Sequence, residues 1–216
     1  MKNYFVKTPR ILRRYFSRYI WCFSAKTKEI YLTFDDGPTP KITNFVLSEL
    51  KKYNAKATFF CIGKNIQQYP SIFTSIILDG HSIGNHTQNH LNGYKCSTKR
   101  YLENFEECHT TIAKYNPLPN SQKLFRPPYG KITRPQASKI IKKGYKIIMW
   151  DVLSADFDPN SSKERCLQNV LQSTNNGSIL IFHDSVKAAQ KVRFVLPKIL
   201  KEFTDKGFTF KAIAAL

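Results

Sequence analysis

The feature that most constrains the fold of this chain is a regular alternation of short apolar segments with longer amphipathic ones. The short segments predict strands at residues 30–34, 57–62, 82–85, 124–126, 146–152, 178–183 and 208–213. The longer segments predict helices at residues 41–53, 66–78, 99–115, 134–143, 163–172 and 186–203. Strands that alternate with crossover helices predict a parallel α/β sheet, and 216 residues suffice for one α/β barrel.

A barrel of this kind carries its chemistry at the C-terminal ends of the strands, so polar residues that follow a predicted strand are candidates for a site. The predicted strand at 30–34 is followed by Asp35 and Asp36, and then by Gly37 and Pro38. Adjacent carboxylates repel each other unless a cation or an arginine neutralises them. The alternative is an ordinary turn with two solvated acids.

Two histidines follow the predicted strand at 82–85. His86 and His90 are four residues apart, and three of the five histidines of the chain lie within residues 81–90. Two histidines at this spacing can converge on one metal ion. With an Asp or Glu as the third ligand, a fourth position stays open for water, as in catalytic zinc sites. Two surface histidines are the alternative, and their clustering counts against it.

Two further strand ends carry candidate residues. Arg126 precedes Pro127 and Pro128, which stiffen the backbone and so fix where the arginine points. An arginine near paired aspartates would lower their pKa values and orient one of them. His183 ends an apolar strand and is a candidate general acid. The alternatives are an exposed arginine in a turn and a core histidine bound to a backbone carbonyl.

Five motifs follow one another in order, each at the end of a predicted strand. They are TFDDGP at 33–38, HTQNH at 86–90, RPPYG at 126–130, WD at 150–151 with DF at 156–157, and LIFHD at 180–184. In this combination the sequence resembles the polysaccharide deacetylase family, the NodB homology or carbohydrate esterase family 4 group. The motifs span residues 33–184, with similar flanks from about residue 28 to the C-terminus.

The resemblance implies a fold, a base and a metal site. The fold would be a distorted (β/α) barrel of seven or eight strands, similar to a TIM barrel. Asp35 would be the catalytic base, and Arg126 would hold it in place. Asp36, His86 and His90 would bind a divalent metal ion, Zn²⁺ first, with Co²⁺ or Ni²⁺ as alternatives.

The resemblance also implies an acid and an oxyanion site. His183 would be the general acid, tuned by Asp156. The backbone N–H of Tyr129 would help to bind the oxyanion of the reaction. One residue departs from the family pattern, because Phe157 stands where the family often has tryptophan. That residue would line the site, so the change bears on substrate shape rather than on chemistry.

The implied reaction is metal-dependent hydrolysis of N-acetyl groups on amino-sugar polymers or oligomers, with release of acetate. Chitin oligomers, peptidoglycan and other acetylated glycans are all candidate substrates. Hydrolysis of O-acetyl esters on glycans would use the same residues and is an alternative. A catalytically inactive glycan-binding homologue is another, but the metal and base residues are all present, which favours an enzyme.

The charge of the chain is strongly positive. It has 34 Lys and Arg residues against 15 Asp and Glu residues, a formal net charge of +19. Such a surface attracts acidic partners, and we expect at most weak association with an anionic membrane or wall polymer. The sequence has no zinc-finger spacing, RRM aromatic motif or glycine-rich phosphate loop, so we expect no nucleic-acid partner.

The chain divides into a basic amphipathic N-terminal segment, residues 1–27, and a deacetylase-like domain, residues 28–216. Thr8 and Pro9 predict the start of a helix over residues 9–20, with Thr8 as its cap, which packs on the barrel. The apolar run at 19–23 is too short for a secretory signal. Five cysteines without a C-x-x-C pair indicate free thiols in a reducing compartment. We therefore expect a cytoplasmic protein, with membrane association and secretion as the alternatives.

Overall fold

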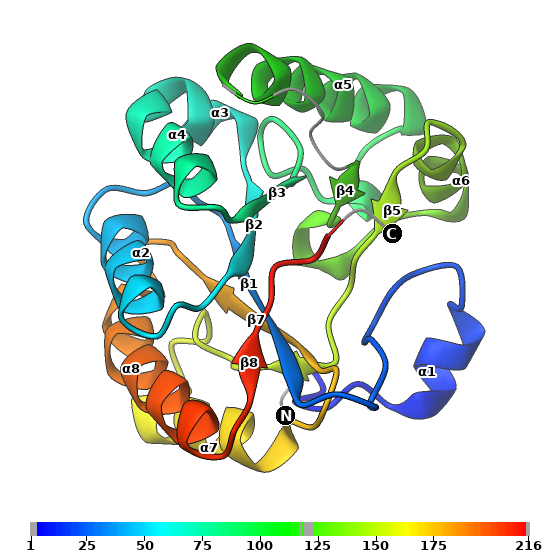
Figure 1. Cartoon of the computed structure of the whole chain (residues 1–216). Helices are drawn as coiled ribbons and strands as arrows, with labels where there is room; N and C mark the ends of the chain where they lie inside the picture. The colour runs from blue at the N-terminus through cyan, green and yellow to red at the C-terminus, as the bar shows by residue number, and fades with distance from the viewer. Residues whose placement is uncertain (1–3, 117, 119–122, 215–216) are drawn as a thin grey trace.

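The computed structural model describes residues 4–116, 118 and 123–214, which form a curled parallel sheet surrounded by helices (Figure 1). The strands are β1 (Glu29–Asp35), β2 (Ala57–Cys61), β3 (Ser82–Asn85), β4 (Leu124–Phe125), β5 (Lys146–Ile147), β6 (Val152–Leu153), β7 (Ile179–His183) and β8 (Thr209–Phe210). Their order is β5-β4-β3-β2-β1-β7-β6, and β8 pairs with β1. All these pairings are parallel, and the expected distorted barrel is confirmed.

The helices cover the outside of this sheet. They are α1 (Arg10–Tyr15), α2 (Ile42–Lys52), α3 (Gly63–Gln68), α4 (Pro70–Leu78), α5 (Thr98–Tyr115), α6 (Arg134–Lys142), α7 (Lys163–Ser173) and α8 (Ala189–Asp205), with 3-10 turns at Gly93–Lys95 and Pro128–Gly130. Each longer helix turns an apolar face to the strands, and burial of one such aliphatic side chain contributes about 1.5–3 kcal/mol. Thr133 and Gln136 form a reciprocal capping box that fixes the start of α6.

Two predicted elements are split in the structure. The helix expected over 66–78 is broken at Pro70, which begins α4, because a proline has no N–H to donate and is favoured in the first turn of a helix. The strand expected over 146–152 becomes β5 and β6. Between them Met149 donates its backbone N–H to the carbonyl of Ile20 at 2.7 Å, so the N-terminal part of the chain takes the place of a strand partner.

The prediction of a helix over residues 9–20 was wrong in its length and in its N-cap. It begins at Arg10 and ends at Tyr15, and its N-cap is Pro9, which has no side chain that can cap it. The Thr8 hydroxyl instead donates to the carbonyl of Trp150 at 2.8 Å, since a tertiary partner lies within reach. Ile11, an apolar residue of this helix, is 79% exposed and so does not pack on the barrel.

We call residues 4–27 the N-terminal segment; it lies along the side of the sheet between β5 and β6. Isolated bridges join Ile20 to Ile148, Lys7 to Val152 and Cys22 to Ser178. In Figure 1, α1 is seen at the lower right, between α6 and α7. The backbone of the segment therefore continues the sheet where its two end strands leave a gap. The domain boundary at residue 27 stays a prediction.

An ionic contact fixes the N-terminal segment to the barrel. The carboxylate of Asp151 is 3% exposed, and its Oδ2 lies 2.6 Å from Nζ of Lys7. Its Oδ1 lies 3.2 Å from Nη1 of Arg13, and the hydroxyl of Ser178 donates to Oδ2 at 2.7 Å. A buried carboxylate without such partners is costly, so the segment and the barrel stabilise each other.

The expected cytoplasmic location and the expected reducing compartment remain predictions. None of the helices in the described part of the chain is long and apolar enough to cross a membrane. All five cysteines are free thiols in the structure.

The contact with Asp151 generates a test of stability. Replacing both Lys7 and Arg13 by alanine should lower the free energy of unfolding by about 1–3 kcal/mol, because a buried carboxylate loses its charged partners, both themselves partly exposed to solvent. Urea denaturation measures the change. Lys99→Ala is the control, since the Lys99–Glu103 pair is exposed, and it should cost less than about 0.5 kcal/mol. Equal effects of the two changes would contradict this interpretation.

Candidate active site

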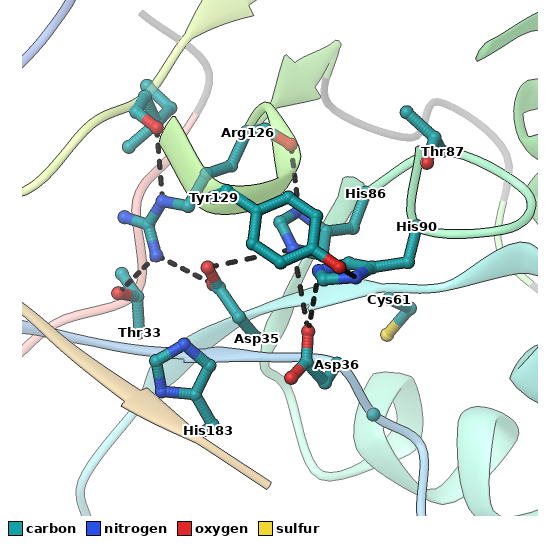
Figure 2. A network of polar contacts seen from close by, with 12 residues as sticks. Thr33, Asp35, Asp36, Cys61, His86, Thr87, His90, Arg126, Tyr129 and His183 are labelled. Atoms are coloured by element: carbon teal, nitrogen blue, oxygen red, sulfur yellow. Dashed lines mark hydrogen bonds and ion pairs between the residues drawn. The ribbon is translucent and has the colours of Figure 1, made fainter. Parts of the chain in front are cut away.

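A cleft of about 750 Å³ opens at the C-terminal ends of the strands. Six of the eight residues singled out in the sequence line it, namely Asp35, Asp36, His86, His90, Tyr129 and His183. The other two, Arg126 and Asp156, are fully buried behind the wall of this cleft. The structure thus brings together residues from five separate motifs, and Figure 2 shows how most of them face one another.

At the bottom of the site, Arg126 and Asp35 form a buried ion pair. The Arg126 side chain is 0% exposed, and its Nη1 lies 2.8 Å from Oδ1 of Asp35. The same Nη1 donates to the hydroxyl oxygen of Thr33 at 2.7 Å, while Nε and Nη2 donate to the carbonyls of Ile148 and Met149. These bonds fix the guanidinium, which in turn fixes one carboxylate oxygen of Asp35 and leaves the other toward the cleft (Figure 2).

Asp36, His86 and His90 converge beside this pair. Oδ1 of Asp36 lies 3.1 Å from Nε2 of His90 and 3.6 Å from Nε2 of His86. The ligand atoms of the three residues lie within 4.8 Å of one another. Nδ1 of His86 donates to the carbonyl of Arg126 at 2.7 Å, and Nδ1 of His90 lies 3.1 Å from the Tyr129 hydroxyl. Both imidazoles are therefore held with Nε2 toward Asp36.

The chemistry of this trio fits a divalent cation. Oδ1 of Asp36 is buried, and no hydrogen bond reaches it within the described residues. Burial opposes ionisation of Asp36, but His90, His183 and His86 hold the pKa of this carboxyl well below its usual range. Burial lowers the pKa of His86 to about 4, so its Nε2 offers a lone pair. A carboxylate and two neutral imidazoles are the ligands that catalytic zinc sites use.

His183 faces the cleft from the end of β7 and is bound to a buried carboxylate. Oδ1 of Asp156 lies 2.8 Å from Nδ1 of His183, and Oδ2 of Asp156 accepts the backbone N–H of His183 at 2.7 Å. Burial by itself would lower the pKa of His183, but the charge and hydrogen bond of Asp156 raise it to about 9, helped by Asp36 and Asp35. His183 is therefore protonated at neutral pH and can donate a proton.

Asp184, for which the sequence predicted no role, supports the site. It is fully buried, and it accepts the backbone N–H of Gly37 at 3.0 Å and the hydroxyl of Thr43 at 2.6 Å. A Cβ on Gly37 would lie 2.0 Å from Oδ2 of Asp184, so only glycine permits this approach. The contact fixes the turn that follows Asp36. Its position next to His183 in a motif was the only signal in the sequence.

The N-terminal segment also reaches the cleft, which the sequence did not indicate. Tyr4 is one of the residues that line the cleft, and its ring centroid lies 5.6 Å from that of Phe157. Phe157 in turn packs edge-on against the imidazole of His183 at 5.2 Å. No spacing or motif in the chain links residue 4 to residue 157, because only the closure of the barrel brings them together.

The fold is an incomplete parallel α/β barrel. One edge of it carries an arginine-held carboxylate, a protonated histidine and an Asp/His/His trio that could hold a metal ion, and these groups define the class of hydrolases that work by acid–base chemistry. The profile of the family described as polysaccharide deacetylase matches residues 24–148. The chain belongs to this family, and the resemblance carried by the five motifs is confirmed.

Several relatives and solved structures are similar to this chain. It is 33% identical to a peptidoglycan-N-acetylglucosamine deacetylase of Bacillus cereus, over 92% of this chain and 72% of the relative. It is 31% identical to the peptidoglycan-N-acetylmuramic acid deacetylase PdaC of Bacillus subtilis, over 88% of this chain but 38% of PdaC. The Bc1960 peptidoglycan N-acetylglucosamine deacetylase, crystallised with 4-naphthalen-1-yl-N-oxidanyl-benzamide, matches with a TM-score of 0.86, 30% identity and 95% coverage of both chains.

The buried ion pair generates a test of stability that does not depend on activity. Arg126→Met should cost about 3–5 kcal/mol of unfolding free energy, because it leaves the Asp35 carboxylate buried without a counter-charge. The double variant Asp35→Asn with Arg126→Met should cost less than the sum of the two single changes, as expected for residues in contact. Denaturant unfolding of the three variants measures the coupling. Additive losses would mean that the two charges do not stabilise each other.

Proposed function

We propose that this protein removes N-acetyl groups from amino-sugar units of a glycan chain, with peptidoglycan as the first candidate substrate. The proposal rests on one observation, namely that two sets of functional groups face the same cleft. Asp35 and Asp36 lie beside His86 and His90, while His183 approaches from β7 with Asp156 behind it. The names of the similar enzymes, which act on N-acetylglucosamine or N-acetylmuramic acid units, support the choice of substrate.

Asp36, His86 and His90 would hold one divalent metal ion, with Zn²⁺ as the first candidate and Co²⁺ or Ni²⁺ as alternatives. When bound, such an ion would supply a Lewis acid that polarises an amide carbonyl and makes a water easier to deprotonate. The hydrogen bonds at the two Nδ1 atoms orient the imidazoles before any ligand arrives, so little reorganisation is needed on binding.

Asp35 would act as the general base. Its Oδ1 is bound by Arg126, whereas its Oδ2 lies 3.8 Å from Nε2 of His86, on the side of the proposed metal site. Oδ2 is therefore placed to take the proton of the attacking water. The guanidinium holds the carboxylate in one orientation, which aligns the base without a cost at the moment of reaction.

His183 and Tyr129 would complete the reaction. The departing amine is too basic to leave without a proton, and His183, kept protonated by Asp156, would donate it. The backbone N–H of Tyr129 would donate to the developing oxyanion. Tyr129 has a left-handed backbone, with φ of 60°, in the turn that follows Arg126. The products would be the free amino sugar and acetate.

The decisive experiment is acetate release by the purified full chain from a panel of substrates. The panel contains peptidoglycan, oligomers of N-acetylglucosamine and O-acetylated xylan, each assayed after chelation and after addition of Zn²⁺, Co²⁺ or Ni²⁺. Release from the N-acetylated glycans that depends on added metal supports the proposal. Release from the O-acetylated substrate alone would make the protein an esterase, and no release from any substrate would favour an inactive glycan-binding homologue.

Retention of the chain on wall polymer at low salt would test the role of the +19 charge.

Substitutions of the neighbouring residues Asp35 and His86 should differ in their effects on metal content and on kcat. His86→Ala should lose the bound metal and activity together while the fold is retained, since a catalytic metal need not hold the barrel together. Asp35→Asn should keep metal content near that of the wild type while kcat falls by roughly 10²–10⁴, the range for loss of a general base. Elemental analysis and kcat are measured on the same samples. Loss of metal in Asp35→Asn with normal turnover at saturating metal would reverse the roles of Asp35 and Asp36.

The pair of His183 and Asp156 generates a prediction about pH. A general acid must be protonated, so kcat/KM should fall as the pH rises through the pKa of His183. Because Asp156 raises that pKa, Asp156→Asn should lower it and move the alkaline limb of the pH profile to lower pH. Asp205→Asn, an exposed change on α8, should leave the limb where it is. An unmoved limb in Asp156→Asn would show that another group donates the proton.

A further inference from the structure

A second cavity, of about 320 Å³, adjoins the catalytic cleft on the side of the N-terminal segment. The two share part of their lining, namely Tyr4, Tyr129, Gly130, Trp150 and Leu153. The volume is that of a small-molecule site. The shared residues show that the two cavities are neighbours, so a chain-like ligand that extends beyond the cleft on this side comes next to the second cavity.

The lining of the second cavity is rich in aromatic rings that solvent reaches. Phe5 is 65% exposed, Tyr94 is 63% exposed and Tyr129 is 61% exposed. Both tryptophans of the chain, Trp21 and Trp150, also line it. Large aromatic side chains gathered at an exposed hollow mark a binding site rather than an ordinary surface. Their flat faces match ligands that have an apolar face and a polar rim.

The part of the N-terminal segment that carries Phe5 is held in place by the barrel. The backbone N–H of Thr8 donates to the carbonyl of Asp151 at 2.8 Å, and that of Leu153 donates to the carbonyl of Val6 at 2.8 Å. A Cβ on Gly130 would lie 2.7 Å from the ring of Trp150, so the glycine lets this ring lie against the loop. The cavity is therefore formed before a ligand binds, which reduces the entropy lost on binding.

We propose that the second cavity is a sugar subsite that binds a ring next to the one being deacetylated, in the same glycan chain. This inference rests on the function proposed above. A pyranose ring presents C–H groups on its faces and hydroxyls at its edge, which suits stacking on rings such as Tyr94 and Phe5. A linear polymer with one unit in the catalytic cleft must continue along the surface, and the second cavity adjoins that cleft at Tyr129 and Trp150. The N-terminal segment then determines how well long substrates bind.

Phe5 and Tyr94 permit a clean test, because they line the second cavity but not the catalytic cleft and are mostly exposed. Each is replaced by alanine in the full chain, and kinetics are measured on N-acetylglucosamine and on its oligomers of two to six units. With the hexamer, kcat/KM should fall by about three- to tenfold, mostly through KM. With free N-acetylglucosamine, which has no neighbouring ring, the change should be less than about twofold.

Tyr15→Ala is the matched control. Tyr15 is also an exposed aromatic residue of the N-terminal segment, 66% exposed, but it does not line the second cavity. Its replacement should leave the ratio of activity on the hexamer to activity on free N-acetylglucosamine unchanged. An equal loss in Tyr15→Ala would mean that the segment acts only through stability, and it would overturn the subsite.

Binding is measured separately from turnover through tryptophan fluorescence, since both tryptophans line the second cavity. In an Asp35→Asn background, titration with the hexamer should change the emission, and adding Tyr94→Ala should weaken the apparent affinity by about three- to tenfold. Emission unaffected by the hexamer, together with unchanged kinetics of Phe5→Ala and Tyr94→Ala, would overturn the subsite and leave the deacetylase reaction intact. A wild-type chain that releases no acetate would refute the proposed function, and the titration would still decide whether the cavity binds sugar.

Discussion

The arrangement of the site depends on the burial of one arginine. The side chain of Arg126 binds Asp35, and its backbone carbonyl binds Nδ1 of His86, so one residue orients both the proposed base and a proposed metal ligand. The guanidinium also binds the carbonyls of Ile148 and Met149, where the chain leaves β5. A fully buried cation needs all of these partners, and satisfying it therefore ties the ends of several strands together. The residues of the cleft are held in position by the same bonds that satisfy this charge.

Two histidines at the same edge of the barrel are in opposite protonation states for physical reasons. His86 is buried beside Arg126 and His90, and desolvation lowers its pKa to about 4. The side chain of His183 is 14% exposed, but the carboxylate of Asp156 outweighs its partial desolvation and raises its pKa to about 9. A neutral imidazole can bind a cation and a protonated one can act as an acid. The separation of roles arises from the neighbours of each ring, not from the type of residue.

The N-terminal segment belongs to the architecture of the site as well as to that of the barrel. It continues the sheet between β5 and β6, and its basic residues neutralise the buried Asp151. Tyr4 then reaches the catalytic cleft and packs on Phe157, close to His183. The segment is fixed to the barrel by backbone bridges and ionic contacts, and it supplies part of the wall of the cleft.

The sequence by itself determined the parallel α/β class, because strand and helix periodicities are local, and it determined the candidate residues, because each follows a strand whose end lies at the same edge. It could not give the breaks at Pro70 and between β5 and β6, or the short helix that ends at Tyr15, since tertiary partners override local preference there. Only the tertiary structure decided which histidine is charged and which buried acid supports the turn at Gly37. Protonation and burial depend on neighbours distant in sequence, and no local pattern records them.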